Sequence, residues 1–190
     1  MKKRLFLTGP SGCGKSTVLL EALGEKMALA GGFRTVRHRN PDGKVSDFTL
    51  QKPVDDGTAR IFLDFSGPDP LRPKVFRQLG VTLLRQAREE PFAVLDEIGG
   101  IELLEPAFLV ELEELLTGEM PCIGVLKGDS SATMLIEKLG LGAAYRWLYG
   151  DLVQTMRSDP DTLIVEMKDR QEDTARELVS RWVEEYAHEA

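Results

Sequence analysis

The sequence predicts an α/β fold in which helices flank a mostly parallel β-sheet, with a β-hairpin inserted in the N-terminal half. Short apolar runs alternate with longer segments whose apolar residues recur at helical spacing. These runs are nearly continuous, which is typical of strands covered on both faces. Close to the N-terminus, an apolar run, a glycine-rich turn and a helical pattern follow one another, as in a parallel β–α unit.

The N-terminal half is expected to hold a strand, a helix and the hairpin. The apolar run at 5–8 predicts the strand, and the helix formers at 16–30 predict a helix that Gly31-Gly32 ends. Strand patterns on both sides of an Asn-Pro-Asp-Gly turn predict the hairpin. It comprises residues 33–39, the turn 40–43 and residues 44–50.

Beyond the hairpin, strand and helix patterns alternate to the C-terminus. Apolar runs predict strands at 59–65, 92–95, 122–126 and 163–167. Helical spacing predicts helices at 73–89, 105–117, 130–139 and 174–188. Neither pattern prevails over 143–156, so the structure of this segment is left open. No repeat or linker interrupts the alternation, and we expect a single domain over residues 1–190.

Composition and charge exclude several classes of function. Apolar residues make up 42% and charged residues 29% of the chain, so neither disorder nor a membrane partner is expected. A net charge of −7 argues against a nucleic-acid partner, because binding its backbone takes a broad basic surface. The only two cysteines, Cys13 and Cys122, lie in an expected glycine loop and an expected buried strand. They do not form a disulfide framework, and a cytoplasmic location is expected.

A phosphate-binding motif follows the first expected strand. Residues 9–16 match G-x-x-x-x-G-K-[ST] without a gap, between a strand and a helix as the motif requires. Its glycines let backbone N–H groups wrap a phosphate closely, and the helix start adds further N–H groups. Lys15 is expected to reach the β- and γ-phosphates, and the Ser16 hydroxyl to bind Mg²⁺. The expected nucleotide-binding residues are Gly9, Pro10, Ser11, Gly12, Cys13, Gly14, Lys15, Ser16 and Thr17.

Two carboxylates directly follow the apolar run at 92–95. The carboxyl ends of parallel strands form the ligand crevice of such a sheet, so both carboxylates are expected beside the phosphate loop. Asp96 would hold Mg²⁺, which prefers oxygen ligands. Glu97 would orient and polarise the water that attacks the γ-phosphate.

A further cation is expected to stabilise the charge that develops on the γ-phosphate. The candidates are Arg37, Arg39, Arg60, Lys127 or a residue of another subunit. Lys127-Gly128-Asp129 also resembles half of the guanine-reading motif of GTPases, but Leu126 stands where the asparagine would be. Capping of the following helix by Asp129 is therefore the favoured interpretation.

Three blocks of the sequence resemble a known family. The phosphate loop, Gly32-Phe33-Arg34-Thr35 and residues 96–103 are similar to small P-loop nucleoside-triphosphatases of the cancer-related nucleoside-triphosphatase type. The resemblance implies a RecA-like P-loop NTPase fold and hydrolysis of nucleoside triphosphates with loose base preference. It also implies that Asp96 and Glu97 are the family's acidic pair and that Arg39 matches a basic position in its hairpin. Among the cation candidates, Arg39 is therefore the one we expect to be catalytic.

The chain departs from this family at two places. Gly100-Ile101 stands where Lys-Met is usual, and Asp47-Phe48 stands where Gly-Phe is usual. Both departures concern contacts to the base and not the phosphate chemistry.

The expected function is Mg²⁺-dependent hydrolysis of ATP, GTP and other nucleoside triphosphates to diphosphate and phosphate. Glu97 next to Asp96 favours water as the acceptor. Two alternatives remain open: a nucleoside or nucleotide kinase, which needs a second pocket and a lid such as the loop 66–73, and a nucleotide-gated switch acting on a protein partner. The sequence identifies no such partner.

Overall fold

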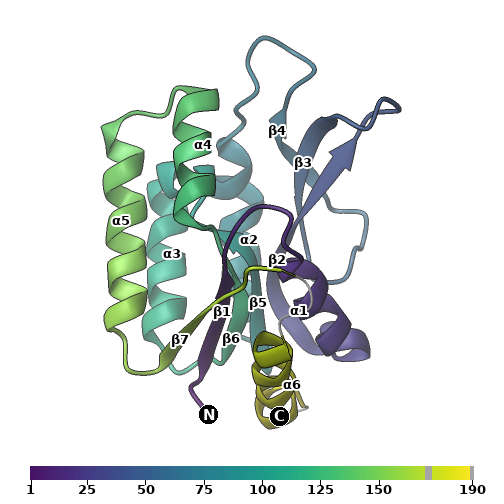
Figure 1. Ribbon diagram of the computed structural model, residues 1–190, viewed down its shortest axis with the longest axis vertical. Coiled ribbons are helices and arrows are strands. Elements are labelled where there is room, and N and C mark those ends of the chain that lie inside the picture. The colour runs from purple at the N-terminus through teal and green to yellow at the C-terminus, as the bar shows by residue number, and fades with distance from the viewer. Residues whose placement is uncertain (170–172, 189–190) are drawn as a thin grey trace.

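The computed structural model describes residues 1–169 and 173–188 and contains one seven-stranded sheet (Figure 1). Along the sheet the strands stand in the order β4-β3-β2-β5-β6-β1-β7. Five neighbouring strands, from β2 to β7, are parallel, whereas β3 and β4 pair antiparallel at one edge. The strands are β1 (Arg4–Thr8), β2 (Ala30–Arg39), β3 (Val45–Gln51), β4 (Arg60–Asp64), β5 (Phe92–Ile98), β6 (Cys122–Leu126) and β7 (Thr162–Glu166).

Helices cover both faces of the sheet, and Figure 1 shows α1 and α6 on the side opposite α3, α4 and α5. The helices are α1 (Lys15–Leu23), α2 (Val81–Ala87), α3 (Pro106–Thr117), α4 (Asp129–Leu139), α5 (Ala143–Ser158) and α6 (Asp173–Tyr186). Alternation along β1 sends Leu5 and Leu7 into the core under α1 and α6, and Phe6 into the opposite core. Both faces of the parallel strands are therefore buried, as their apolar sequences predict.

The predicted mostly parallel sheet, its flanking helices and the hairpin of β2 and β3 are confirmed. The segment 143–156, left open above, forms α5. The helix expected at 73–89 begins with a wider turn at Phe76–Gly80 before α2. Among the described residues, no helix is long and apolar enough to cross a bilayer. That the whole chain is a single domain stays a prediction.

The first helix ends earlier than predicted. It stops at Leu23, a tighter turn follows at Gly24–Leu29, and Gly31 and Gly32 lie inside β2. A Cβ on Gly31 would lie 2.4 Å from the Cα of Ala87, and one on Gly32 would lie 2.2 Å from the carbonyl oxygen of Val94. These glycines therefore let β2 pack closely against α2 and β5, and do not terminate a helix.

The order of the strands places three loops at one edge of the sheet. β6 lies between β1, which leads into the phosphate loop, and β5, which carries Asp96 and Glu97. Lys127 directly follows β6 at the same edge. Since the carboxyl ends of parallel strands meet there, residues distant in the sequence come together around one pocket.

Candidate active site

The phosphate loop has a backbone that only glycine takes easily. Gly9, Gly12 and Gly14 have φ angles of 136°, 84° and 99°. A Cβ on Gly9 would lie 2.1 Å from the carbonyl oxygen of Met167, so the start of the loop packs directly on the end of β7. The loop leads into α1, whose N-cap is Gly14, and the first N–H groups of this helix face a pocket of about 340 Å³. Such an arrangement suits a phosphate group.

The Lys15 side chain crosses the mouth of the loop. Its Nζ donates hydrogen bonds to the carbonyl oxygens of Gly9 at 2.9 Å and Pro10 at 2.7 Å. The residue is only 9% exposed, so its charge is directed into the phosphate pocket that it lines. The loop is thus held in shape by the cation that phosphate oxygens would attract.

Ser16 and Asp96 form a pair of oxygen donors at the floor of this pocket. Ser16 Oγ donates to Asp96 Oδ1 at 2.8 Å, and Asp96 is buried. Burial, together with the neighbouring Glu97 charge, raises the pKa of Asp96 from 3.8 to about 7. Hydroxyl and carboxylate oxygens are the ligands that Mg²⁺ takes, and they lie where the phosphate motif requires them, so both residues fit a divalent cation.

Glu97 occupies a β-bulge in β5. The pairing with β6 shifts between Asp96 and Ile98, and Glu97 itself has a φ angle of 75°. Successive residues of a regular strand point to opposite faces, whereas the extra residue of a bulge re-aims a side chain. The bulge thereby brings both acidic side chains to the same pocket, which both of them line.

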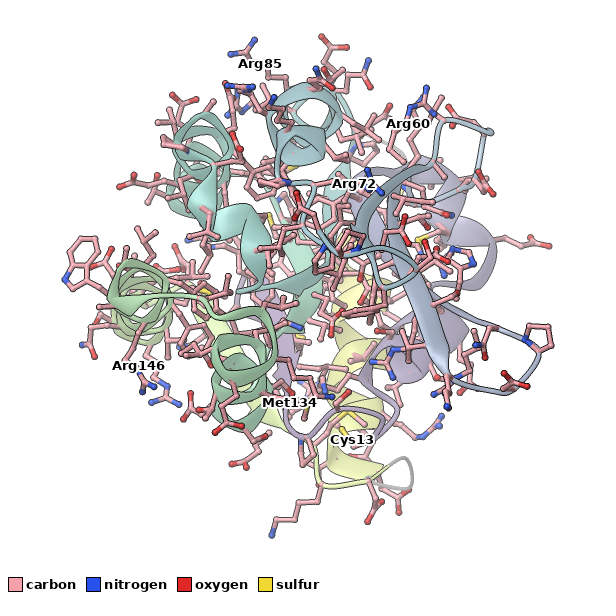
Figure 2. The ribbon with its side chains drawn as sticks, turned by 90° about the horizontal axis from the view of Figure 1, so that it is seen from above. Cys13, Arg60, Arg72, Arg85, Met134 and Arg146 are labelled. Carbon is pink, nitrogen blue, oxygen red and sulfur yellow. The ribbon has the colours of Figure 1, made fainter. Side chains whose placement is uncertain are left out.

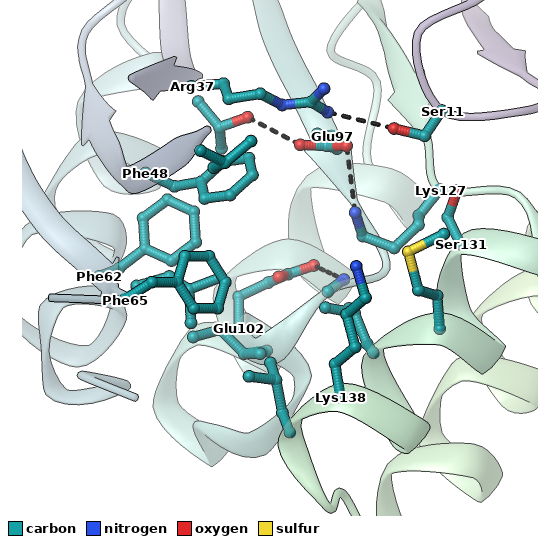
Figure 3. A pocket seen from close by; sticks show the side chains of 18 of the residues that line it. Ser11, Arg37, Phe48, Phe62, Phe65, Glu97, Glu102, Lys127, Ser131 and Lys138 are labelled. Carbon is teal, nitrogen blue, oxygen red and sulfur yellow. Dashed lines mark hydrogen bonds and ion pairs between the residues drawn. The ribbon is translucent and has the colours of Figure 1, made fainter. Parts of the chain in front are cut away.

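The Glu97 carboxylate is held from two sides. Oε1 accepts from Lys127 Nζ at 3.1 Å, and Oε2 accepts from Thr35 Oγ1 at 3.2 Å (Figure 3). Burial opposes ionisation, but the charge and hydrogen bond of Lys127, with help from Arg37, hold the pKa of Glu97 below its ordinary value. The two adjacent carboxyl groups therefore differ: Glu97 is ionised at neutral pH, while Asp96 titrates there.

Of the two arginines considered as cations on β2, Arg37 reaches the site and Arg39 does not. Arg37 Nη2 donates to Ser11 Oγ at 3.1 Å, its guanidinium lies 5.4 Å from the ring centre of Phe48, and it lines the phosphate pocket. Arg39 lies at the exposed end of the hairpin, where Nη1 donates to the Gly43 carbonyl at 2.6 Å, and it lines neither the phosphate pocket nor its neighbour. The structure therefore does not bring Arg39 to either pocket, and its role as the catalytic cation stays an untested prediction.

Of the other two cation candidates, Lys127 lies in the site and Arg60 does not. Lys127 lies in the site through its bond to Glu97. Arg60 is exposed, donates to the carbonyl oxygens of Thr58 and Ala59, and lies well apart from Cys13 of the phosphate loop (Figure 2).

Capping of α4 by Asp129 was predicted but does not occur. The N-cap is Gly128 and receives no side-chain hydrogen bond. Asp129 Oδ1 instead accepts from the Tyr149 hydroxyl at 2.9 Å, and the same hydroxyl also approaches the Lys127 carbonyl oxygen at 2.8 Å. Tyr149 on α5 therefore fixes the loop that carries Lys127.

Arg34 and Thr35 also line the phosphate pocket, although no motif in the sequence marks them as site residues. Arg34 Nη1 donates to the Pro53 carbonyl, but its Nε is buried without a partner among the described residues. Its charge also lowers the pKa of Asp96 against the effect of burial. The period of two along β2 could have placed Thr35 on the same face as Arg37.

We expect Asp96→Asn to stabilise the metal-free protein at pH 8 and to stabilise it clearly less at pH 5. The folded chain keeps a proton on Asp96 between pH 3.8 and about 7 that the unfolded chain has lost, so the stability of the parent protein falls as the pH rises across this range. Asparagine carries no titrating proton, so the variant escapes this loss. One pKa unit corresponds to about 1.4 kcal/mol, so the gain at pH 8 should be a few kcal/mol. Urea unfolding in a chelator measures it, with exposed Asp151→Asn as control. An equal effect of Asp96→Asn at both pH values would contradict the burial of a titrating carboxyl.

Known proteins resemble the chain in sequence and in fold. A family model described as NTPase matches residues 4–148. The chain is 31% identical over 137 residues to nucleoside-triphosphatase THEP1 of Methanosarcina acetivorans, covering 67% of this chain and 77% of that protein. It is 29% identical over 177 residues to THEP1 of Methanosarcina barkeri, covering 88% and 90%.

A solved structure agrees with this assignment at the level of the fold. The crystal structure of THEP1 from the hyperthermophile Aquifex aeolicus matches with a TM-score of 0.63 at 19% identity, over 93% of this chain and 96% of that one. The predicted P-loop fold is thereby confirmed. Together with the family model and the relatives, these observations show that the chain belongs to the NTPase family.

Proposed function

We propose that the phosphate loop, Asp96 and Glu97 form the hydrolytic centre of this nucleoside-triphosphatase, working with Mg²⁺ and with loose base preference. The chain belongs to the NTPase family, and its relatives are named nucleoside-triphosphatases, so it hydrolyses nucleoside triphosphates. The Glu97 carboxylate is the main support for this site: it lies beside the loop, Lys127 keeps it ionised, and it accepts a hydrogen bond from Thr35.

The residues around the loop divide the work of binding. Backbone N–H groups of the loop and of the first turn of α1 cradle the phosphates. Lys15, already directed into the pocket, exchanges its two carbonyl partners for oxygens of the β- and γ-phosphates. Ser16 and Asp96 hold Mg²⁺, which when bound neutralises charge on the phosphate oxygens. Binding the cation requires Asp96 to lose its proton.

Glu97 acts on the attacking water. An ionised carboxylate at the γ-phosphate end of the pocket can orient a water molecule and accept its proton as the oxygen–phosphorus bond forms. Its two hydrogen bonds fix the position of the carboxylate, and such fixed geometry supplies a large part of catalysis. Arg37 and Lys127 both reach this end, and we assign to Arg37 the stabilisation of charge on the γ-phosphate because Lys127 is paired with Glu97.

Loose base preference follows from the chemistry of discrimination. A site that selects one base strongly does so with buried polar groups that a wrong base would leave unpaired. The only base-reading pattern in the sequence lacks its asparagine, and Asp129 within it is already bonded to Tyr149. Two free thiols, Cys13 and Cys122, accord with the reducing cytoplasm that we propose as its location.

Release of phosphate from ATP, GTP, CTP and UTP tests the function. We expect all four to be hydrolysed, with values of kcat/KM that differ by less than about a hundredfold. In the same assay Arg37→Ala should lower kcat by about 10²-fold or more, whereas Arg39→Ala, with an exposed side chain outside the pocket, should not. Equal loss in both variants would reject the assignment of Arg37, and absence of turnover with every triphosphate would reject the hydrolytic site.

A further inference from the structure

A second cavity opens beside the phosphate pocket (Figure 3). Its volume is about 290 Å³, close to the lower end of the range for pockets that hold small molecules. β3 and β4 form one wall and α4 forms the opposite wall, with Phe48, Phe62 and Phe65 facing Ser131 and Lys138. Met134 of α4 also lines the cavity. The two walls of the cavity therefore come from elements other than the phosphate loop and α1.

Aromatic rings dominate one wall of this cavity. The ring centre of Phe48 lies 6.1 Å from that of Phe62 and 6.4 Å from that of Phe65, and the ring centres of Phe62 and Phe76 are 4.9 Å apart. Phe65 remains 43% exposed although it belongs to this cluster. Such a wall offers its rings to a flat aromatic ligand, which binds by stacking with little demand on its substituents.

Polar groups stand at defined places around the aromatic wall. Glu102 is 3% exposed and lines the cavity, and its Oε1 accepts from the backbone N–H groups of Gly99 at 2.5 Å and Gly100 at 2.7 Å. A carboxyl group fixed in this way can pair with ring N–H or exocyclic amino groups of a heteroaromatic base. Lys138 from α4 adds a cation to the lining. The lining thus combines stacking surface with hydrogen-bonding groups.

The cavity adjoins the γ-phosphate end of the nucleotide and not its base end. Of the loop residues 11–17, only Ser11 lines it, while Gly12, Gly14 and the start of α1 line the phosphate pocket. In this motif, the backbone N–H groups around Gly12, Gly14 and the start of α1 cradle the α- and β-phosphates. The ribose and base of a bound triphosphate would therefore extend from the end of the pocket that is away from the second cavity. Thr35, Arg37 and Glu97 line both cavities. Glu97 therefore faces the γ-phosphate from one side and the second cavity from the other.

We propose that this cavity binds a nucleoside whose 5′-hydroxyl replaces water as the acceptor of the γ-phosphoryl group. The base stacks on the phenylalanines and pairs with Glu102, and the hydroxyl lies before Glu97. The hydroxyl oxygen bonds to the γ-phosphorus as the bond to the bridging oxygen breaks. The electron pair of that bond leaves with the nucleoside diphosphate, and the hydroxyl proton passes to Glu97. This inference rests on the proposed function in one respect, the place of the γ-phosphate before Glu97.

Transfer of label tests the inference. The protein is incubated with Mg²⁺ and ATP labelled at the γ-phosphate, together with adenosine, guanosine, cytidine, uridine or thymidine, and labelled phosphate is separated from labelled nucleoside monophosphate. We expect labelled monophosphate with at least one nucleoside. Equilibrium dialysis of the same nucleosides, in the presence of an ATP analogue that is not hydrolysed, measures occupancy of the cavity without turnover.

Two neighbouring serines of α4 give a matched pair of variants. Ser131 lines the cavity, so Ser131→Trp should fill it and remove both nucleoside binding and labelled monophosphate, while release of phosphate to water continues. Ser130 is exposed and lies outside the lining, so Ser130→Trp should change neither product. Phe65→Ala removes one exposed ring and should weaken nucleoside binding about 5- to 100-fold.

The possible negative results of the label-transfer experiment reject different parts of the proposal. Labelled phosphate without labelled monophosphate from any of the five nucleosides would overturn the acceptor site and leave hydrolysis intact. Transfer that Ser131→Trp leaves unchanged would also overturn it, because the acceptor would then lie elsewhere. Absence of both labelled products would overturn the proposed function together with the acceptor site.

Discussion

Lys15→Ala should abolish measurable hydrolysis, with a loss of at least about 10³-fold in turnover. The substitution removes the only cation that lies across the mouth of the loop within the described residues, where Nζ donates to two loop carbonyl groups. It should weaken the binding of a triphosphate far more than that of a nucleoside, because the lost charge is directed at the β- and γ-phosphates.

Single-turnover hydrolysis and equilibrium binding of ATP and adenosine measure the two effects of Lys15→Ala. Lys74→Ala is a suitable control, because it also removes one positive charge but from an exposed residue outside the phosphate pocket. Hydrolysis close to the parental rate in Lys15→Ala would reject the assignment of the phosphate loop.

Glu97→Gln should slow single-turnover hydrolysis by about 10²- to 10⁴-fold while nucleotide binding stays similar or becomes tighter. Glutamine keeps the size of the side chain but cannot accept the proton of the attacking water. It also removes a negative charge that repels the γ-phosphate, and it frees Lys127 from its ion pair. Lys15, Ser16 and Asp96 are unchanged in this variant and should still hold the nucleotide and Mg²⁺.

The comparison with two other carboxylates makes the Glu97 result specific. Asp96→Asn should in addition weaken the dependence on Mg²⁺, and exposed Glu89→Gln should change neither property. If Glu97→Gln hydrolyses at the parental rate, Glu97 has a structural role and another group positions the water.

The local parts of the site could be predicted from sequence because their geometry is encoded locally. A phosphate loop is a continuous run whose glycines and neighbouring helix form the binding surface together. The acidic pair is likewise placed by one strand, since the end of a buried parallel strand meets the crevice. The bulge that turns Glu97 toward the site was not predicted, because nothing in the run 92–98 distinguishes a bulge from regular pairing.

The parts of the site and the fold that sequence patterns could not place depend on distances between elements. Arg37 and Arg39 lie on the same face of β2, and the choice between them depends on how far the hairpin extends beyond the loop. The pairing shifts between His38 and Arg39, which leaves Arg39 at the hairpin end. A Gly-Gly pair after a helical pattern predicts a helix end, whereas Gly31 and Gly32 lie in β2 and let it contact α2 and β5. The second cavity is lined by many segments that lie far apart in the sequence, so it has no sequence pattern of its own.

Because the backbone at Glu97 is left-handed, selection for stability and selection for activity would favour different residues at this position. A glutamate with a φ angle of 75° bears a steric cost on the order of 1 kcal/mol or more that glycine would escape. In a lineage under pressure for heat resistance alone, glycine would be an advantageous replacement here, and it would remove the carboxylate. The persistence of an acidic residue at this position would therefore be a sign that catalysis is still under selection, readable from sequences before any assay is done.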